Sequence, residues 1–146
     1  MASERDSRLS GNHTEVFIHF TWSTMGRAPY LSPDIREDVY ACIRSGCARQ
    51  GLTVVALNGI EDHVHLLVRM TTTTTVADVV RQAKGASSHF VNHSGDDRGF
   101  RWQDGYAAFS VSRWDAPKVA GYIANQVEHH RDGTTKDALE PLSAIG

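Results

Sequence analysis

Two histidines one residue apart, His63 and His65, are the residues of this chain best suited to metal chemistry. They lie in the run 61–68, which has the apolar character of a buried strand. Because side chains alternate across a strand, both histidines project to one face of the sheet, whereas Val64 projects to the other. Adjacent imidazoles can be a pair of metal ligands, or a structural pair of hydrogen-bonded core residues. The strand alone leaves both interpretations open.

A tyrosine and a glutamine form the second candidate pair. Tyr122 and Gln126 are four residues apart in a segment with helical character, so their side chains share one face of a helix. The phenol of Tyr122 can supply a nucleophile, and the amide oxygen of Gln126 can add a third ligand to a metal held by His63 and His65. The alternative is a tyrosine packed on the sheet with Gln126 facing water. In combination with the two histidines, that alternative is less attractive.

The composition fits one globular domain. The chain has 146 residues, of which 40% are hydrophobic and 22% charged, and this is enough for a single core. No apolar run approaches the roughly 18 residues of a membrane span, and the polar residues 1–7 lack the apolar segment of a signal peptide. We therefore expect a cytoplasmic protein that does not associate with membranes. Cys42 and Cys47 are five residues apart, which suits neither a redox pair nor a zinc ribbon.

The charge balance limits how the chain can bind nucleic acid. A net charge of −2 lacks the broad positive field that is typical of avid nucleic-acid binders, so any DNA contact must be local. Between residues 81 and 118, basic side chains outnumber acidic ones. The basic residues are Arg81, Lys84, Arg98, Arg101, Arg113 and Lys118, and the acidic ones are Asp96, Asp97, Asp104 and Asp115.

Four residues of that segment are candidates for DNA binding. Arg81 and Lys84 can meet the DNA backbone from a predicted helix, although charges on a helix face are more commonly solvated. Arg113 is a third basic candidate. Trp102 can stack on an unpaired base, and core packing is its alternative role.

Two further residues are candidates for supporting the histidine pair. His19 is expected on the same sheet face as His63 and His65, where it can orient a ligand or phosphate, or serve as a buried structural histidine. Asp62 precedes His63 and can hydrogen-bond a ligand histidine, although turn chemistry explains it equally well.

The order of strand and helix patterns predicts one architecture. The order βαββαβ followed by a helix is that of an α+β, ferredoxin-like sandwich with a four-stranded antiparallel sheet. Two helices would cover the apolar face, and the additional C-terminal helix, which carries the tyrosine, would cover the polar face. The predicted strands are 15–22, 52–58, 63–70 and 106–112, and the predicted helices are 33–50, 76–91, which follows a capping box at 75–78, and 115–131.

Several separate motifs then occur in a recognisable order. They are Phe20-Thr21-Trp22-Ser23-Thr24, His63-Val64-His65-Leu66-Leu67, Trp102-Gln103-Asp104-Gly105-Tyr106 with Phe109-Ser110-Val111-Ser112, and Tyr122-Ile123 to Gln126 with His129-His130. Across about residues 16–131 the chain resembles the single-tyrosine HUH transposases of small insertion sequences, the IS200-like group that includes the REP-associated tyrosine transposases. This combination is far more specific than an isolated His-x-His pair.

The resemblance implies an enzyme that cleaves and rejoins single-stranded DNA through a covalent 5′-phosphotyrosine. It assigns Tyr122 as the catalytic nucleophile and His63, His65 and Gln126 as ligands of Mg²⁺ or Mn²⁺. It also implies single-stranded DNA with hairpin ends as the partner, and a homodimer in which Tyr122 acts in cis or in trans. On this interpretation residues 1–14 are a flexible N-terminus, 15–131 form a single catalytic domain, and 132–146 are a tail with a short helix over 135–139.

Three alternatives remain open at this level. A domesticated or non-cutting relative would bind hairpin DNA without cleaving it. A two-histidine phosphoesterase would use paired His-x-Thr motifs, of which His19-Phe20-Thr21 provides one and His63-Val64-His65 departs from the other. A metal-storage or structural role would leave Tyr122 without a function. Metal dependence and substitution of Tyr122 distinguish these alternatives.

Overall fold

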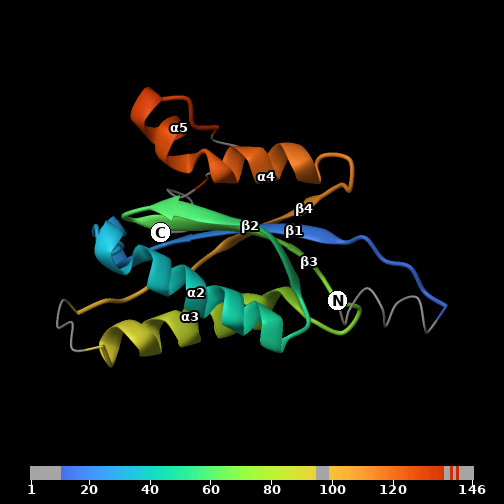
Figure 1. The fold of residues 1–146 in the computed structure, drawn as a ribbon, viewed down its shortest axis with the longest axis horizontal. Coiled ribbons are helices and arrows are strands. Elements are labelled where there is room, and N and C mark those ends of the chain that lie inside the picture. The colour runs from blue at the N-terminus through green and yellow to red at the C-terminus, as the bar shows by residue number, and fades with distance from the viewer. Residues whose placement is uncertain (1–10, 95–98, 137–138, 140, 142–146) are drawn as a thin grey trace.

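A four-stranded antiparallel sheet separates two layers of helices (Figure 1). The computed structural model describes residues 11–94, 99–136, 139 and 141. The strands are β1 (Phe17–Ser23), β2 (Thr53–Ile60), β3 (His63–Arg69) and β4 (Ala107–Val111), and they lie in the order β2-β3-β1-β4. Every neighbouring pair is antiparallel, so the predicted α+β sandwich with its antiparallel sheet is confirmed.

The helices divide between the two faces of this sheet. Helices α2 (Pro33–Arg49) and α3 (Val76–Asn92) lie below it in Figure 1, and α4 (Ala116–Ala124) and α5 (Gln126–Asp132) lie above it. A short 3-10 turn, η1 (Met25–Arg27), follows β1. None of the helices in the described part of the chain combines the length and apolar character needed to span a membrane.

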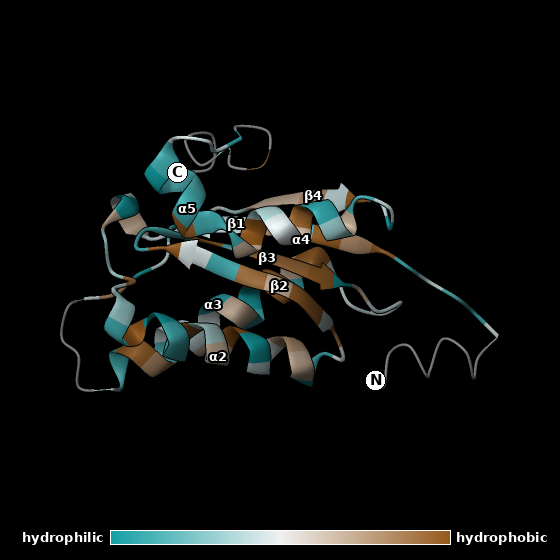
Figure 2. Cartoon of the chain, turned by 45° about the horizontal axis from the view of Figure 1, so that its top comes forward, coloured by the Kyte–Doolittle hydropathy of each residue, from teal (hydrophilic) through white to brown (hydrophobic). Residues whose placement is uncertain are grey.

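The central strand β3 is buried on both faces. Val64, Leu66 and Val68 pack into the main core beneath the sheet, where α2 and α3 contribute their apolar faces. Leu67 packs on the opposite face with Ile123 of α4. Figure 2 shows hydrophobic residues along the strands and on the helix faces turned toward them. Since burial of one large aliphatic side chain contributes roughly 1.5–3 kcal/mol, these two layers fix which face of β3 the histidines occupy.

Two predicted helix starts are confirmed. Helix α2 begins at Pro33, whose fixed φ suits the first helical position, and Ser32 is its N-cap residue. Helix α3 begins after Thr75, whose side-chain oxygen accepts a hydrogen bond from the backbone N–H of Asp78 at 3.1 Å. The predicted capping residue therefore satisfies one of the backbone donors that every helix start exposes.

The prediction of one continuous C-terminal helix was wrong. The segment forms α4 and α5 with a break at Asn125, whose backbone has φ −101° and ψ 24°. The carbonyl of Ala124 accepts a 3.0 Å hydrogen bond from the side-chain amide of Asn58 in β2. A continuous helix would use that carbonyl internally, and asparagine is a poor residue for a helix interior. The break places Gln126 at the start of α5.

Two predictions at the chain ends fall largely outside the described residues. Most of the predicted flexible segment 1–14 and residues 137–138 of the predicted helix 135–139 are not described. Thr135 and Lys136, which are described, are not helical.

We expect Gly59→Ala to lower the free energy of unfolding by about 1–3 kcal/mol, because the protein must shift to admit a Cβ. A Cβ at Gly59 would lie 2.2 Å from the carbonyl oxygen of His63 and 2.9 Å from Cα of Val64. The control is Gly85→Ala in α3, where a Cβ meets nothing within 4 Å and alanine favours the helix by up to about 1 kcal/mol. Urea unfolding measures both effects, and equal stability of the two variants would contradict this packing.

Candidate active site

Strand β3 places His63 and His65 on the sheet face that α4 and α5 cover. In the sheet register His63 is opposite Ser23 and His65 is opposite Thr21 of β1. Both histidine side chains are fully buried, and their ring centroids are 5.1 Å apart at an interplanar angle of 78°. Neighbouring residues on one strand face therefore form a paired-imidazole site, as the alternation of the sequence predicted.

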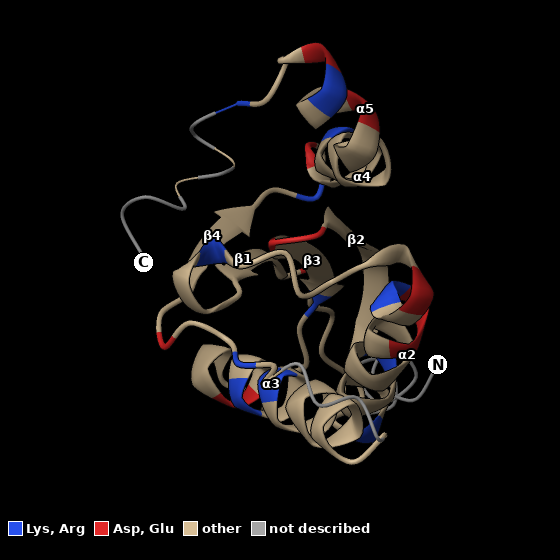
Figure 3. Cartoon of the chain, turned by 90° about the vertical axis from the view of Figure 1, so that its left-hand side faces the viewer, with Lys and Arg blue, Asp and Glu red and all other residues tan. Residues whose placement is uncertain are grey.

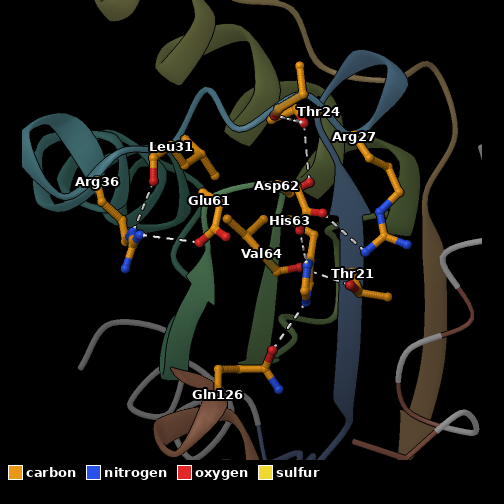
Figure 4. A network of polar contacts seen from close by, with 11 residues as sticks. Thr21, Thr24, Arg27, Leu31, Arg36, Glu61, Asp62, His63, Val64 and Gln126 are labelled. Carbon is orange, nitrogen blue, oxygen red and sulfur yellow. Dashed lines mark hydrogen bonds and ion pairs between the residues drawn. The ribbon is translucent and has the colours of Figure 1, made fainter. Parts of the chain in front are cut away.

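A chain of polar contacts orients His63 (Figure 4). Its Nδ1–H donates to Oδ1 of Asp62 at 2.8 Å, and Oδ2 of Asp62 pairs with Nη2 of Arg27 at 3.2 Å. Burial opposes the negative charge of Asp62, but the hydrogen bond and charge of His63 and the charge of Arg27 lower the pKa of the carboxyl overall. Asp62 therefore remains an ionised acceptor that holds the ring of His63 in one orientation.

The opposite edge of the His63 ring faces Gln126. Nε2 of His63 is 3.1 Å from Oε1 of Gln126, and both side chains are fully buried. Because Nδ1 of His63 carries the proton that Asp62 accepts, Nε2 can meet the amide oxygen in two ways, through a second proton on the ring or through a cation bound by both atoms. Two lone pairs at this distance repel unless a proton or a cation lies between them. The geometry therefore suits a shared cation, which is the role expected of these two residues.

His65 has the same arrangement with a different partner. Its Nδ1 forms a 2.9 Å hydrogen bond with Nε2 of His19 from β1, and the two rings stack with centroids 5.1 Å apart. In both site histidines Nδ1 is engaged, so Nε2 is the nitrogen suited to act as a ligand. His19 and Asp62, proposed from sequence as supporting residues, each contact a ring nitrogen of the histidine pair, as residues behind metal ligands commonly do.

Tyr122 of α4 lies in the same buried site. Its ring is edge-on to that of His65, with centroids 6.2 Å apart and an angle of 85°, and its side chain is only 6% exposed. The phenol oxygen accepts a 3.0 Å hydrogen bond from the backbone N–H of Lys136. The structure therefore brings the candidate nucleophile and the three candidate ligands together within one chain.

Two residues of α5 complete the surroundings, and sequence reasoning gave them no role. His129 stacks on the Tyr122 ring at 4.4 Å and 23°, and its Nδ1 contacts Oγ1 of Thr134 at 2.9 Å. The His130 ring is 4.9 Å from that of His63. Burial, followed by the nearby charge of His63, lowers the pKa of His130 and favours its neutral form. His129 and His130 follow Gln126 by three and four residues in a helical segment, and this spacing was the signal in the sequence that could have placed them near the site.

The charge around the site is sparse. Lys, Arg, Asp and Glu lie mainly on the helices and connections (Figure 3), and among the strands only β3 carries one, Arg69 at its end. Within the described residues no group of three His, Cys, Asp or Glu side chains is arranged to hold a metal. A metal at the histidine pair would therefore need the neutral amide of Gln126, and three protein ligands leave coordination positions for a substrate.

The structure does not bring the four predicted DNA-binding residues to this site. Arg81 pairs with Asp78 at 2.7 Å on an exposed face of α3. Lys84 is half-buried, and its ammonium donates to the backbone carbonyls of residues 103, 104 and 105 at 2.6, 3.1 and 3.0 Å. Burial lowers the pKa of Lys84. Its contacts are those of a residue that fastens a loop to α3.

The other two predicted DNA-binding residues also have partners within the chain. Trp102 is buried against Trp22 in an edge-on contact of 5.9 Å, and its indole N–H donates to Oγ of Ser87 at 2.9 Å. These contacts match the core-packing alternative for Trp102. Arg113 is exposed and pairs with Glu15 at 2.7 Å.

Comparisons with known proteins agree on one family. The family model described as "Transposase IS200 like" matches residues 12–126. The ISDra2 transposase TnpA of Deinococcus radiodurans is 28% identical in an alignment of 118 residues that covers 77% of this chain and 84% of the relative.

Two solved structures are similar to this chain. The crystal structure of a candidate transposase from Deinococcus radiodurans R1 aligns with a TM-score of 0.62 at 28% identity, over 80% of this chain and 94% of that one. The structure of a REP-associated tyrosine transposase bound to a REP hairpin aligns with a TM-score of 0.63, over 83% of this chain and 70% of that one. Its identity is 14%, so this second likeness shows the fold alone.

Substitution of Lys84 tests its structural role. We expect Lys84→Met to lower the free energy of unfolding by about 1–3 kcal/mol, because a charged donor to three carbonyls is lost. Arg81→Met, which removes an exposed ion pair on the same helix, should change stability by no more than about 0.5 kcal/mol. Thermal or urea unfolding measures both, and a negligible effect of Lys84→Met would show that the lysine does not fasten the loop.

Proposed function

The chain belongs to the family of IS200-like transposases, and we propose that it cleaves and rejoins single-stranded DNA through a covalent bond between Tyr122 and a 5′ phosphate. The resemblance inferred from its motifs is confirmed at the level of the family. One structural observation supports the proposed covalent role of Tyr122. The Tyr122 ring lies 6.2 Å from His65 in a buried site where His63 faces the amide oxygen of Gln126 at 3.1 Å.

The proposed step exchanges one phosphoester bond for another. The phenol oxygen of Tyr122 bonds to phosphorus, the bond from phosphorus to the 3′ oxygen breaks, and the proton lost by the phenol is balanced by one gained at the 3′ oxygen. A second 3′ hydroxyl can then reverse the reaction and rejoin strands, because the phosphotyrosine retains the ester bond. A phenol has a pKa near 10 and needs help to ionise at neutral pH.

Contacts of the Tyr122 side chain suit this role. The backbone N–H of Lys136 donates to the phenol oxygen at 3.0 Å, which favours negative charge on that oxygen. His129 covers one face of the ring, and His65 contacts it from the side. The ring is therefore held in place and largely shielded from water, so that little freedom is lost when it aligns with a phosphate.

We propose Mg²⁺ or Mn²⁺ as the cofactor, held by Nε2 of His63, Nε2 of His65 and Oε1 of Gln126. These donors fit a metal site because Oε1 of Gln126 already faces Nε2 of His63, and the other ring nitrogen, Nδ1, is hydrogen-bonded to the carboxylate of Asp62. Such an ion supplies polarisation of the phosphate and stabilisation of charge on the departing oxygen. Imidazole ligands favour Mn²⁺ as the tighter-binding of the two metals.

Single-stranded DNA with hairpin ends is the substrate that we propose. Support comes from the fold, which this chain shares with a transposase whose structure holds a REP hairpin. The homodimer implied by the resemblance stays a prediction. Because Tyr122 approaches His65 of its own chain, a single chain contains every residue that the proposed chemistry requires.

The two-histidine phosphoesterase alternative is not favoured by the contacts of its expected motif. In that mechanism the threonine hydroxyl would contact the substrate phosphate. Here the hydroxyl of Thr21 donates to the backbone carbonyl of Val64 at 2.9 Å, and His19 contacts His65.

Covalent capture tests the nucleophile. We expect the wild-type protein, given Mn²⁺ and labelled single-stranded DNA from the flanks of its own gene, to form an adduct that survives a denaturing gel. Tyr122→Phe should form none, because it lacks the attacking oxygen, while keeping DNA affinity within about twofold. Chelation by EDTA should also abolish the adduct. Binding of the same DNA without any adduct would instead indicate a non-cutting relative.

Metal binding in the absence of DNA tests the ligand set. We expect Gln126→Ala to weaken Mn²⁺ binding, measured by calorimetry, by tenfold or more, since one of three protein ligands is lost. Val127→Ala is the matched control, because Val127 is adjacent on α5 and exposed. Equal Mn²⁺ affinity of these two variants would remove Gln126 from the proposed site.

A further inference from the structure

One tryptophan lies on the surface of the protein, outside the buried core. Trp114 is 75% exposed, and it is the only Trp, Tyr or Phe among the described residues whose side chain is classed as exposed. The other large exposed hydrophobic side chains are Val16, Val55 and Val127. An exposed tryptophan offers a large flat apolar surface that water solvates poorly, so it is a candidate contact for a ligand.

An arginine covers one side of this tryptophan. The guanidinium carbon of Arg113 lies 4.6 Å from the centroid of the Trp114 ring, a cation–π contact. Nη1 of Arg113 donates to Oε2 of Glu15 at 2.7 Å, which fixes the guanidinium against the ring. Aromatic rings and arginine planes are the two side-chain surfaces on which unpaired bases stack.

The pair lies in the turn that leads into the helix of the proposed nucleophile. The backbone N–H of Asp115 contacts both the carbonyl and the hydroxyl oxygen of Ser112 at 3.1 Å, which fixes the turn between β4 and α4. Trp114 lies in the turn just before α4, and Tyr122 follows the first helical residue, Ala116, by roughly 9 Å along the helix axis. A few nucleotides of an extended strand can span this separation.

We propose that Trp114 and Arg113 form a stacking platform for an unpaired base of the single-stranded DNA that reaches Tyr122. This inference rests on the proposed function and adds a DNA-contact site to it. Two other residues predicted to contact DNA are not available to it, because Trp102 is buried and the ammonium of Lys84 donates to backbone carbonyls.

Charge on this surface does not account for DNA binding by itself. Arg113 and Lys118 are balanced by Glu15 and Asp115, and the chain as a whole carries a net charge of −2. Stacking on an aromatic ring tolerates any base, because every base has a π face, and it adds to whatever the basic residues contribute. The platform therefore distinguishes strands by the presence of bases rather than by phosphate charge.

Two probes of equal charge test the platform. The affinities of a labelled 15-nucleotide oligo(dT) and of an abasic strand of the same length are measured by fluorescence anisotropy without metal. We expect the wild-type protein to prefer the base-bearing strand, and Trp114→Ala to weaken binding of oligo(dT) by roughly five- to fiftyfold while changing the abasic strand little. Trp114→Phe, which keeps an aromatic face, should retain most of the preference. Val55→Ala, an exposed change on β2, is the control.

Three results would overturn the proposal. They are wild-type binding that does not depend on bases, Trp114→Ala binding equal to wild type, and equal losses on the two probes.

Light scattering of the same variants identifies the competing role, which is contact with a second copy of the chain. If Trp114→Ala dissociates a dimer and leaves oligo(dT) affinity intact, the surface belongs to a second copy of the chain. The outcome is separable from the chemistry, because adduct formation by Tyr122→Phe would refute the proposed function without affecting the stacking measurement.

Discussion

Burial of β3 on both faces is the constraint on which the rest of the structure depends. Val64 and Leu66 are held in the core with α2 and α3, so the alternate residues His63 and His65 must point to the opposite face. Two imidazoles cannot be buried there without polar partners. The turn before β3 supplies Asp62, β1 supplies His19, and α5 supplies Gln126. The layer formed by α4 and α5 thus covers the sheet and also carries the candidate nucleophile and the third candidate ligand.

The contact between His63 and Gln126 gives this layer its significance. A buried imidazole nitrogen and a buried amide oxygen 3.1 Å apart are held together by a proton on the nitrogen or by a cation that both atoms bind. The ring of Tyr122 contacts His65 from α4, and His129 stacks on Tyr122 from α5. The break at Asn125 allows the two short helices to present these side chains from different directions. A buried site with one candidate nucleophile and three candidate ligands follows from packing that is mainly apolar.

Local patterns in the sequence were sufficient for the architecture. Alternation along β3, the proline and N-cap at the start of α2, and the capping threonine of α3 are all properties of short segments, and each predicted its element. The break at Asn125 was missed because the hydrogen bond that accompanies it joins Ala124 to Asn58, which is 66 residues earlier in the sequence. The same limit explains the residues proposed for DNA binding. The sequence shows that residue 84 is a lysine, but only the tertiary structure shows that its ammonium donates to three backbone carbonyls. Spacing predicted that Tyr122 and Gln126 share one face of a single helix, whereas the structure brings them to one site from two helices that break at Asn125. The exposure of Trp114 has no signature in the sequence.

The most direct test of the account identifies the residue that carries the DNA. The protein is incubated with Mn²⁺ and single-stranded DNA from the flanks of its own gene, digested with nuclease and trypsin, and analysed by mass spectrometry. We expect the peptide 119–131 to gain the mass of a deoxynucleotide 5′-phosphate, with fragmentation placing it on Tyr122. Cleavage of the DNA with no modified peptide, or with the nucleotide on another residue, would contradict it.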